Sequence, residues 1–145
     1  MPIRLDVVAV DRTVYSDDVD MVIAPGIEGE MGILPRHAPL MTALNYGILV
    51  VKKTGEPDEQ IAIGGGFMEV RPDRVTVLAD SADRAEEIDI AQAEEARRKA
   101  QVSLEQGRGA EDEERALAAL KRAKLQLKLA ERQGGRSRRP SPSAG

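Results

Sequence analysis

Short apolar runs, separated by glycine, proline and aspartate, fill the first half of the chain. Ile3, Leu5 and Val7 alternate with other residues in the period of two that is typical of a strand with one buried face. Further extended runs are predicted at residues 13–15, 19–24, 48–51, 61–63, 67–70 and 75–78. Many short strands separated by turns predict a β-sandwich, or flattened barrel, over residues 1–84.

Three short segments in this half are interpreted from their turn chemistry. Gly29 and Gly32 bracket two residues, which predicts a tight turn. Residues 17–20 (Asp-Asp-Val-Asp) resemble part of a calcium loop but lack the required Gly and terminal Glu, so we interpret them as a turn as well. Gly64-Gly65-Gly66 is followed by a strand and by no Lys-Ser or Lys-Thr, which favours a β-bulge or close backbone packing over a phosphate loop.

The pattern changes near residue 85 to a helical period. Asp89 is expected to cap a first helix, with Gln92 completing a capping box, and Gly107-Arg108-Gly109 to end it. A second helix is expected from about Glu111. The two apolar seams that predict an antiparallel hairpin over residues 85–132 comprise Ala93, Ala96, Ala100 and Leu104 in the first helix and Ala116, Leu120, Ala123, Leu127 and Ala130 in the second. The predicted class is therefore α+β, and because alanine buries little area the hairpin is expected to be marginally stable alone.

Composition narrows the functional classes. The chain has 145 residues, 32% of them charged, with a net charge of −4 and no cysteine. The negative balance argues against general nucleic-acid binding, and the absence of cysteine removes thiolate chemistry. The N-terminus lacks the apolar region of a signal peptide, and no apolar run approaches the roughly 20 residues that span a bilayer.

Charge is polarised along the helical half. Residues 86–114 contain ten acidic and four basic residues, whereas residues 115–139 contain nine basic residues and one acidic residue. Two interpretations are open, a solvated helix face or a docking surface for an acidic partner. Residues 133–145, rich in Gly, Ser, Pro and Arg, are expected to form a disordered basic tail.

No catalytic or metal-binding constellation can be identified. His37 is the only histidine, and it lies in a predicted loop between Pro35 and Pro39. One histidine without cysteine cannot supply the usual ligands of a metal site. The sequence therefore indicates a binding or regulatory protein and not an enzyme.

Three segments resemble one known family. Residues 28–40, Glu-Gly-Glu-Met-Gly-Ile-Leu-Pro-Arg-His-Ala-Pro-Leu, are similar to the signature of the epsilon-subunit family of F-type ATP synthases. Residues 65–70 with 75–78, and residues 84–89, resemble two further segments of that family. The resemblance covers residues 1 to about 132 in one register.

This resemblance implies a non-catalytic subunit of a proton- or sodium-translocating ATP synthase of bacterial type. Residues 1–84 would dock on the gamma subunit and the c-ring in the central stalk, and residues 85–132 would form a mobile regulatory hairpin. When extended, the hairpin would reach the alpha and beta subunits and inhibit ATP hydrolysis. The chain would meet the membrane only through the complex, at the cytoplasmic face of the cell membrane.

The resemblance also assigns roles by position. Contacts to the c-ring and gamma subunit fall on Glu30, Met31, Arg36 and His37, and inhibitory contacts to the beta subunit fall on Arg115, Lys121, Arg122 and Lys124. Some bacterial members bind ATP in the folded hairpin, and the matching positions here are Ile88, Asp89, Ala93 and Arg122. Gln92 and Gln126 stand where such members carry arginine, so ATP binding is expected to be weak or absent, and no resident cofactor is expected.

Two other functions remain open from the residues alone. One is a free-standing nucleotide-sensing module without a rotary partner, and the other is a structural adaptor that does not switch. Co-purification with gamma, alpha and beta subunits would distinguish the rotary subunit from both.

Overall fold

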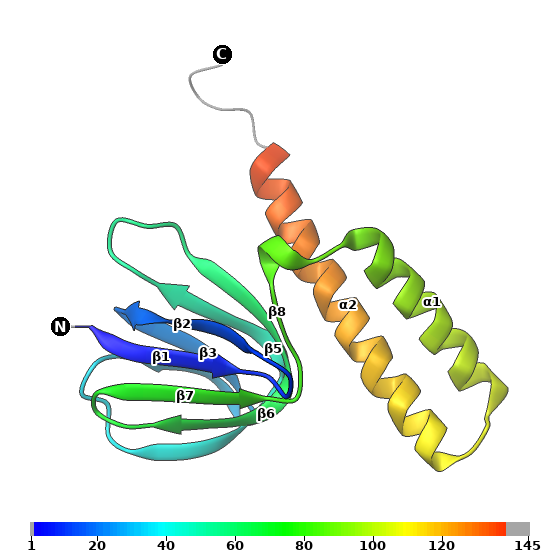
Figure 1. The fold of residues 1–145 in the computed structure, drawn as a ribbon, viewed down its shortest axis with the longest axis horizontal. Helices are drawn as coiled ribbons and strands as arrows, with labels where there is room; N and C mark the ends of the chain where they lie inside the picture. Colours follow the sequence, from blue (N-terminus) through cyan, green and yellow to red (C-terminus); the bar gives the residue numbers. More distant parts are fainter. Residues whose placement is uncertain (1, 139–145) are drawn as a thin grey trace. The chain divides into compact units, whose positions relative to one another are not determined.

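The computed structural model describes the backbone of residues 2–138 and the side chains of residues 2–133. The strands are β1 (Ile3–Val8), β2 (Thr13–Val19), β3 (Met21–Gly26), β4 (Gly29–Ile33), β5 (Leu40–Lys52), β6 (Glu59–Val70), β7 (Arg74–Ala79) and β8 (Ala82–Arg84). They are followed by the 3-10 helix η1 (Ala85–Glu87) and the helices α1 (Ile90–Gln106) and α2 (Ala110–Arg138) (Figure 1). The chain divides into two compact units between Arg84 and Ala85, here called the β unit and the helical unit.

The β unit is one sheet that folds over on itself without closing. Its strand order is β2-β1-β7-β6-β5-β3-β4, and β8 pairs with β6. Among the described strands, β1 and β7 are the only parallel neighbours. The second half of β6 pairs with β7 from Gly66, whereas its first half pairs with β8 through Ile61–Ile63, so β6 changes neighbour at the three glycines. The long strands β5 and β6 curve at this level and carry the sheet from one layer to the other (Figure 1).

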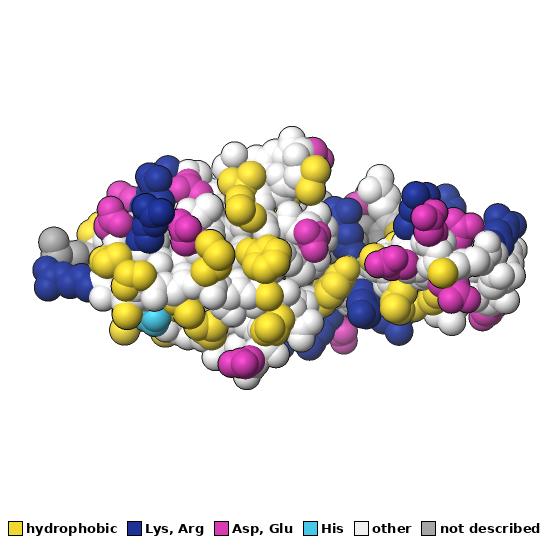
Figure 2. Space-filling view, turned by 90° about the horizontal axis from the view of Figure 1, so that it is seen from below, with side chains coloured by type: hydrophobic (Ala, Val, Ile, Leu, Met, Phe, Trp, Pro, Cys, Tyr) yellow, Lys and Arg dark blue, Asp and Glu magenta, His cyan; other side chains and the backbone are white. Residues whose placement is uncertain are grey.

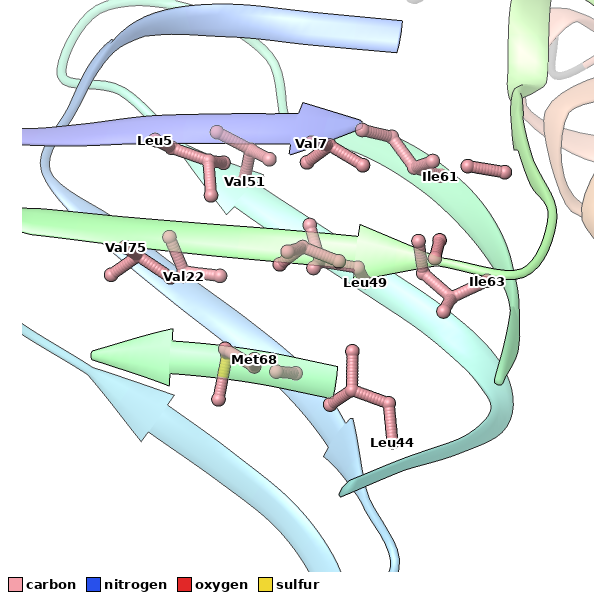
Figure 3. Packing of buried hydrophobic residues seen from close by; sticks show 14 of the residues in the cluster. Leu5, Val7, Val22, Leu44, Leu49, Val51, Ile61, Ile63, Met68 and Val75 are labelled. Atoms are coloured by element: carbon pink, nitrogen blue, oxygen red, sulfur yellow. The ribbon is translucent and has the colours of Figure 1, made fainter. Parts of the chain in front are cut away.

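An aliphatic core lies between the two layers. The alternation predicted for the first strand is confirmed, because Ile3, Leu5 and Val7 are fully buried. Side chains from β1 and β7 point toward those of β3 and β5, with Met68 of β6 among them (Figure 3). A scarcity of aromatic residues is thus compensated by closely packed Val, Ile and Leu side chains.

The triple glycine allows close packing of the backbone, as predicted. Gly65 and Gly66 have φ angles of 86° and 126°, which L-residues rarely adopt. A Cβ atom on Gly66 would collide with the carbonyl oxygen of Leu78 and lie 2.8 Å from the Cα atom of Ala79. Only glycine therefore lets β6 approach β7 while the sheet bends.

Two predicted turns are strands. Residues 29–32 belong to β4, which pairs with β3, and the turn lies at residues 27–28 between them. Asp17 and Asp18 belong to the edge strand β2, where they pair with Leu5 and Arg4 of β1. In both segments the pairing with a neighbouring strand outweighs a weak local preference for a turn.

The strand boundaries also differ from the prediction in β5 and β6. The strand expected at residues 48–51 begins at Leu40, and the runs 61–63 and 67–70 form one continuous strand through the glycines. The reason is that β5 and β6 pair along nearly their whole length, from Leu40 opposite Val70 to Val51 opposite Glu59. This pairing holds the less regular first half of β5 extended.

The helical unit follows its predicted signals closely. The Asp89 side chain accepts a hydrogen bond from the backbone N–H of Gln92 at 3.1 Å and caps α1. Gly107 ends α1 in the left-handed conformation, and α2 begins at Ala110. α1 and α2 pack as an antiparallel hairpin (Figure 1). The sequence signals thus fix both helix ends at the hairpin turn.

The buried seam of the hairpin is mainly alanine, and four residues differ from the prediction. Ala93, Ala100, Ala116, Leu120, Ala123 and Ala130 are buried. Ala96 is exposed, Leu104 and Leu127 are half-buried, and Leu129 is fully buried. Leu129 lies about 200° around the helix from Leu127, so the buried stripe widens near the end of α2.

The second helix extends beyond residue 132, where the predicted hairpin ends and the tail was expected to begin. α2 continues through Gly134 and Gly135 to Arg138. Glycine costs about 1 kcal/mol relative to alanine inside a helix, which weakens a long helix without ending it. Residues 139–145, the rest of the expected tail, lie outside the described residues.

Candidate interaction surfaces

An exposed apolar surface crosses the outer face of three neighbouring strands. Phe67 of β6 lies directly opposite Leu78 of β7 on one side and Ala43 of β5 on the other. The Ile27 N–H donates to the Ala43 carbonyl oxygen at 3.2 Å, which continues the row into the β3–β4 hairpin. Met41 follows on the same face, two residues before Ala43. We call Ile27, Met41, Phe67 and Leu78 the apolar patch.

The apolar patch is well exposed. The exposed fractions are 58% for Ile27, 66% for Met41, 58% for Phe67 and 57% for Leu78. Figure 2 shows apolar side chains gathered over one face of the β unit. Contiguous exposed apolar side chains typically mark an interaction site. Sequence reasoning missed this patch, although the single Phe of the chain at an outward strand position was an available signal.

Two of the residues predicted to contact the c-ring and gamma subunit share one tight turn. Arg36 adopts a φ of 67°, and its N–H donates to the Pro72 carbonyl oxygen at 2.7 Å, which fastens the turn to the β6–β7 connection. The His37 N–H donates to the Leu34 carbonyl oxygen at 3.2 Å, and its Nδ1 atom lies 2.7 Å from the Ala38 carbonyl oxygen. These contacts fix the backbone of both residues and the ring of His37.

The other two predicted contact residues lie on the edge strand β4. Glu30 is exposed and pairs with Pro25 of β3. Met31 packs partly against the core of the β unit, so only part of its surface can meet a partner. Of the four predicted contact residues, two therefore lie in the hydrogen-bonded turn and two on the edge strand β4.

A polar cluster holds β8, the last strand before the helical unit. Arg84 Nε donates to Glu59 Oε1 at 2.8 Å, and the guanidinium lies 5.6 Å from the centre of the Tyr15 ring. Burial, followed by the neighbouring Asp17 carboxylate, raises the pKa of Tyr15. A hydrogen bond from Lys53 Nζ at 2.8 Å lowers the pKa of Asp17. The cluster fixes β8 against β2 and β6 and includes no nucleophile paired with a base.

The four residues predicted to contact the beta subunit form two rows on α2 and not one surface. At about 100° per residue, Arg115 and Arg122 lie within about 20° of each other, whereas Lys121 and Lys124 lie on the opposite flank of the buried seam. Two open grooves flank the contact between α1 and α2, and Arg115 lines one while Lys124 lines the other. We call Arg115 and Arg122 the arginine pair and Lys121 and Lys124 the lysine row.

The residues of the predicted weak ATP site are engaged in the helix structure. Asp89 caps α1, Ala93 is buried against the hairpin seam, and Ile88 is half-buried beside η1. Arg122 is exposed on α2. None of these four residues lines either of the two grooves described above.

Metal and membrane features were also sought. Among the described residues, no group of three or more His, Cys, Asp or Glu side chains is placed to hold a metal ion. None of the helices in the described part of the chain combines the length and apolar character that a membrane crossing requires.

Comparisons with known proteins agree in both units. The family profile described as ATP synthase, Delta/Epsilon chain, beta-sandwich domain matches residues 2–85, and the one described as ATP synthase, Delta/Epsilon chain, long alpha-helix domain matches residues 86–131. The ATP synthase epsilon chain of Dehalococcoides mccartyi (strain BAV1) is 54% identical over 134 residues, covering 90% of this chain and 93% of that one. The epsilon chain of Herpetosiphon aurantiacus is 51% identical over 130 residues, covering 90% and 95%.

A solved structure is similar as well. A chain in the cryo-EM structure of the Euglena gracilis mitochondrial ATP synthase, comprising OSCP, F1 and the c-ring in rotational state 1, superposes with a TM-score of 0.70. It is 27% identical and covers 86% of this chain and 78% of its own length.

Proposed function

The chain belongs to the ATP synthase delta/epsilon family, and on this premise we propose that it is the epsilon subunit of a bacterial F-type ATP synthase, a non-catalytic part of the rotor. Its β unit docks on the gamma subunit and the c-ring and couples catalysis to ion transport. Its helices inhibit ATP hydrolysis when they reach the alpha and beta subunits. It lies peripherally at the cytoplasmic face of the cell membrane, through the complex.

The observation that carries this proposal is the apolar patch. A soluble protein gains nothing from exposing four large apolar side chains on one face unless a partner covers them, because each prefers burial by about 1.5–3 kcal/mol. The patch lies on a rigid sheet, so binding costs little conformational entropy. A long-lived contact with the gamma subunit fits this chemistry better than a transient one.

The turn around Arg36 and the edge strand β4 supply the second contact, with the c-ring. Arg36 and Glu30 are exposed and present opposite charges. Exposed ion pairs contribute about 0–1 kcal/mol each, so these residues set register and orientation more than affinity. The fastened backbone of the turn is what makes such positioning effective.

Inhibition is assigned to α2 because its arginine pair and lysine row are exposed, while its buried seam consists mainly of small side chains. The alanine-rich seam lets the hairpin open at a modest free-energy cost. Both the arginine pair and the lysine row are then available to an acidic segment of the beta subunit. Because the two lie on opposite flanks of α2, one straight partner segment would engage one flank preferentially.

ATP binding is proposed to be weak or absent. Phosphates bind best to fixed guanidinium or ammonium groups, and Gln92 and Gln126 offer only neutral amides. Calorimetry of the purified chain with ATP and Mg²⁺ should show no binding at micromolar concentrations, and Q92R combined with Q126R should strengthen it. Tight binding by the unmodified chain would instead favour the second candidate, a nucleotide-sensing module.

The docking proposal is tested by making the apolar patch polar. F67S combined with L78S should abolish capture by an immobilised gamma subunit, whereas V10S should not. V10S is the control, because Val10 is 89% exposed and lies outside the patch, so this variant also removes an exposed apolar side chain. Tyrosine fluorescence verifies that the β unit stays folded, since both tyrosines lie in it. Equal capture of the two variants would contradict the assignment.

A further inference from the structure

The strand β8 is the last segment of the β unit before the chain enters the helical unit. It comprises Ala82–Arg84 and is the shortest of the described strands. It pairs with β6 through Ile61–Ile63, and Ala82 lies in the buried core. A ladder of three residues contributes few backbone hydrogen bonds, so side-chain contacts decide how firmly β8 is held.

The Arg84 side chain joins two strands that are separated by β1 and β7 in the strand order. Arg84 lies opposite Ile61, which is fully buried, so its side chain starts from the inner face of the sheet. Its Nε atom donates to Glu59 Oε1 of β6 at 2.8 Å, and its guanidinium lies 5.6 Å from the centre of the Tyr15 ring of β2. Arg84 therefore connects β6 to the edge strand β2 through side chains.

The Arg84–Glu59 ion pair is better shielded from water than a similar pair on the same strand. The side chains of Arg84 and Glu59 are 28% and 27% exposed, whereas those of Arg71 and Glu69 are 65% and 40% exposed. Water and salt screen an ion pair more strongly when it is exposed. The Arg84–Glu59 pair should therefore hold its strand more firmly, and the aromatic face of Tyr15 adds a cation–π attraction.

The first residue of β8 is fixed from the same side of the sheet. Arg12, in the connection between β1 and β2, donates from Nη2 to the Ala82 carbonyl oxygen at 3.3 Å. Just before β8, the Gly64 N–H donates to the Ser81 carbonyl oxygen at 2.8 Å. The short strand is thus held near both of its ends, and Arg84 supplies the contact next to the helical unit.

We propose that Arg84, Glu59 and Tyr15, here called the Arg84 clamp, fix the point at which the helical unit is attached, and that Arg84 is a positioning residue for the inhibitory helices. The 3-10 helix η1 begins at Ala85, directly after the clamp. While the clamp is closed, opening of the connection stops at this residue. The clamp itself is independent of the proposed function, whereas its effect on inhibition rests on it.

Loss of the clamp would lengthen the tether of the helices. With β8 detached from β6, residues 80–84 would join the flexible connection to η1. The effective concentration of a tethered group at its target falls as a flexible tether becomes longer than the span requires. A released β8 should therefore weaken inhibition of ATP hydrolysis, although every residue of α1 and α2 is unchanged.

Limited digestion of the full chain with trypsin tests the clamp, because cleavage after Arg84 requires local opening of β8. The initial rate of formation of fragments 1–84 and 85–145 is measured by mass spectrometry. E59Q, which keeps the trypsin site, should raise this rate about 3- to 20-fold. Y15L should raise it about 2- to 5-fold, whereas Y15F keeps the ring and should change it little.

E69Q is the matched control for E59Q. Glu69 also lies in β6 and accepts an ion pair from an arginine, Arg71 Nε, at 3.1 Å. E69Q should leave cleavage after Arg84 unchanged, and the urea midpoints of E59Q and E69Q should agree, because the clamp acts locally. Unchanged cleavage in E59Q would overturn the clamp, as would faster cleavage that a lower urea midpoint of E59Q accounts for.

The positioning role is tested in the reconstituted ATPase. The concentration of E59Q that gives half-maximal inhibition of hydrolysis should rise about 2- to 5-fold, and that of E69Q should not change. Unchanged or stronger inhibition by E59Q, with β8 shown to open, would overturn the positioning role. A chain ending at Ala85 separates the two proposals: if it still inhibits, the proposed function of the helices fails, while the digestion result still decides the clamp.

Discussion

Replacing Gly66 by alanine should destabilise the β unit severely. The residue has a φ of 126°, and an added Cβ atom would collide with the Leu78 carbonyl oxygen and approach the Ala79 Cα atom to 2.8 Å. These are backbone atoms of a paired strand, so they cannot rotate away as a flexible side chain could. Relief would require β6 and β7 to move apart, at the point where β6 also changes its neighbour.

Two separate costs make up the expected loss. Holding an L-residue in this backbone region costs about 1–3 kcal/mol, and overpacking against rigid neighbours costs about another 1–3 kcal/mol. The expected decrease in the free energy of unfolding is therefore about 2–6 kcal/mol, a large part of the roughly 5–15 kcal/mol that stabilises a typical domain.

Gly55→Ala isolates the first cost. Gly55 has a φ of 81°, and an added Cβ atom would meet nothing within 4 Å. The difference between the two variants should then equal the steric cost at Gly66. Urea unfolding followed by tyrosine fluorescence measures both, because Tyr15 and Tyr46 are the only tyrosines and the chain has no tryptophan. Equal destabilisation of the two variants, within about 0.5 kcal/mol, would refute the steric argument.

Three further predictions follow from the two units. A chain ending at Ala85 should still assemble and support coupled ATP synthesis but lose inhibition of hydrolysis, since the core cluster lies wholly in residues 3–82; failure to assemble in reconstituted vesicles would contradict this division. Alanine substitution of the arginine pair and the lysine row together should raise ATP hydrolysis at low salt, and separate variants should show which flank acts; unchanged hydrolysis would exclude the electrostatic account. Asp17→Asn should lower the urea midpoint at neutral pH, because the hydrogen bond from Lys53 lowers the pKa of Asp17 in the folded state. The stabilisation by Asp17 is complete above its unfolded pKa of 3.8 and is lost as the pH falls through the lower folded pKa, so the two proteins should converge in acid. A difference in midpoint that persists in acid would argue for a different cause.

The ends of α1 could be predicted from the sequence, because each depends on only a few neighbouring residues. Asp89 and Gly107 act through one capping hydrogen bond and one left-handed residue, both of which the local sequence specifies. The strand β1 could likewise be predicted from its alternation of apolar residues, because one face of the strand is fully buried.

Features that depend on strand pairing could not be predicted. Residues 40–47 have no regular alternation and are extended because β6 pairs with them. The glycines of β4 favour a turn when its sequence is considered alone, but pairing with β3 makes this segment a strand. The apolar patch could be predicted only from the pairing registers of β5, β6 and β7, because Phe67 and Leu78 lie on different strands and become neighbours when β6 pairs with β7. The grooves between α1 and α2 likewise depend on which residues of the two helices face one another.

The core of the β unit and the seam of the helical hairpin differ in how much apolar surface each residue buries. A fully buried Leu, Ile or Val in the β unit contributes about 1.5–3 kcal/mol, and a buried methyl group of the alanine seam contributes about 0.8 kcal/mol. Each buried alanine of the hairpin therefore contributes about two- to four-fold less than a buried Leu, Ile or Val of the sheet. Straightening its turn into continuous helix would place Gly107 and Gly109 inside a helix at about 1 kcal/mol each. This cost is small compared with the stability of a typical domain, so the turn disfavours rearrangement of the helices without preventing it.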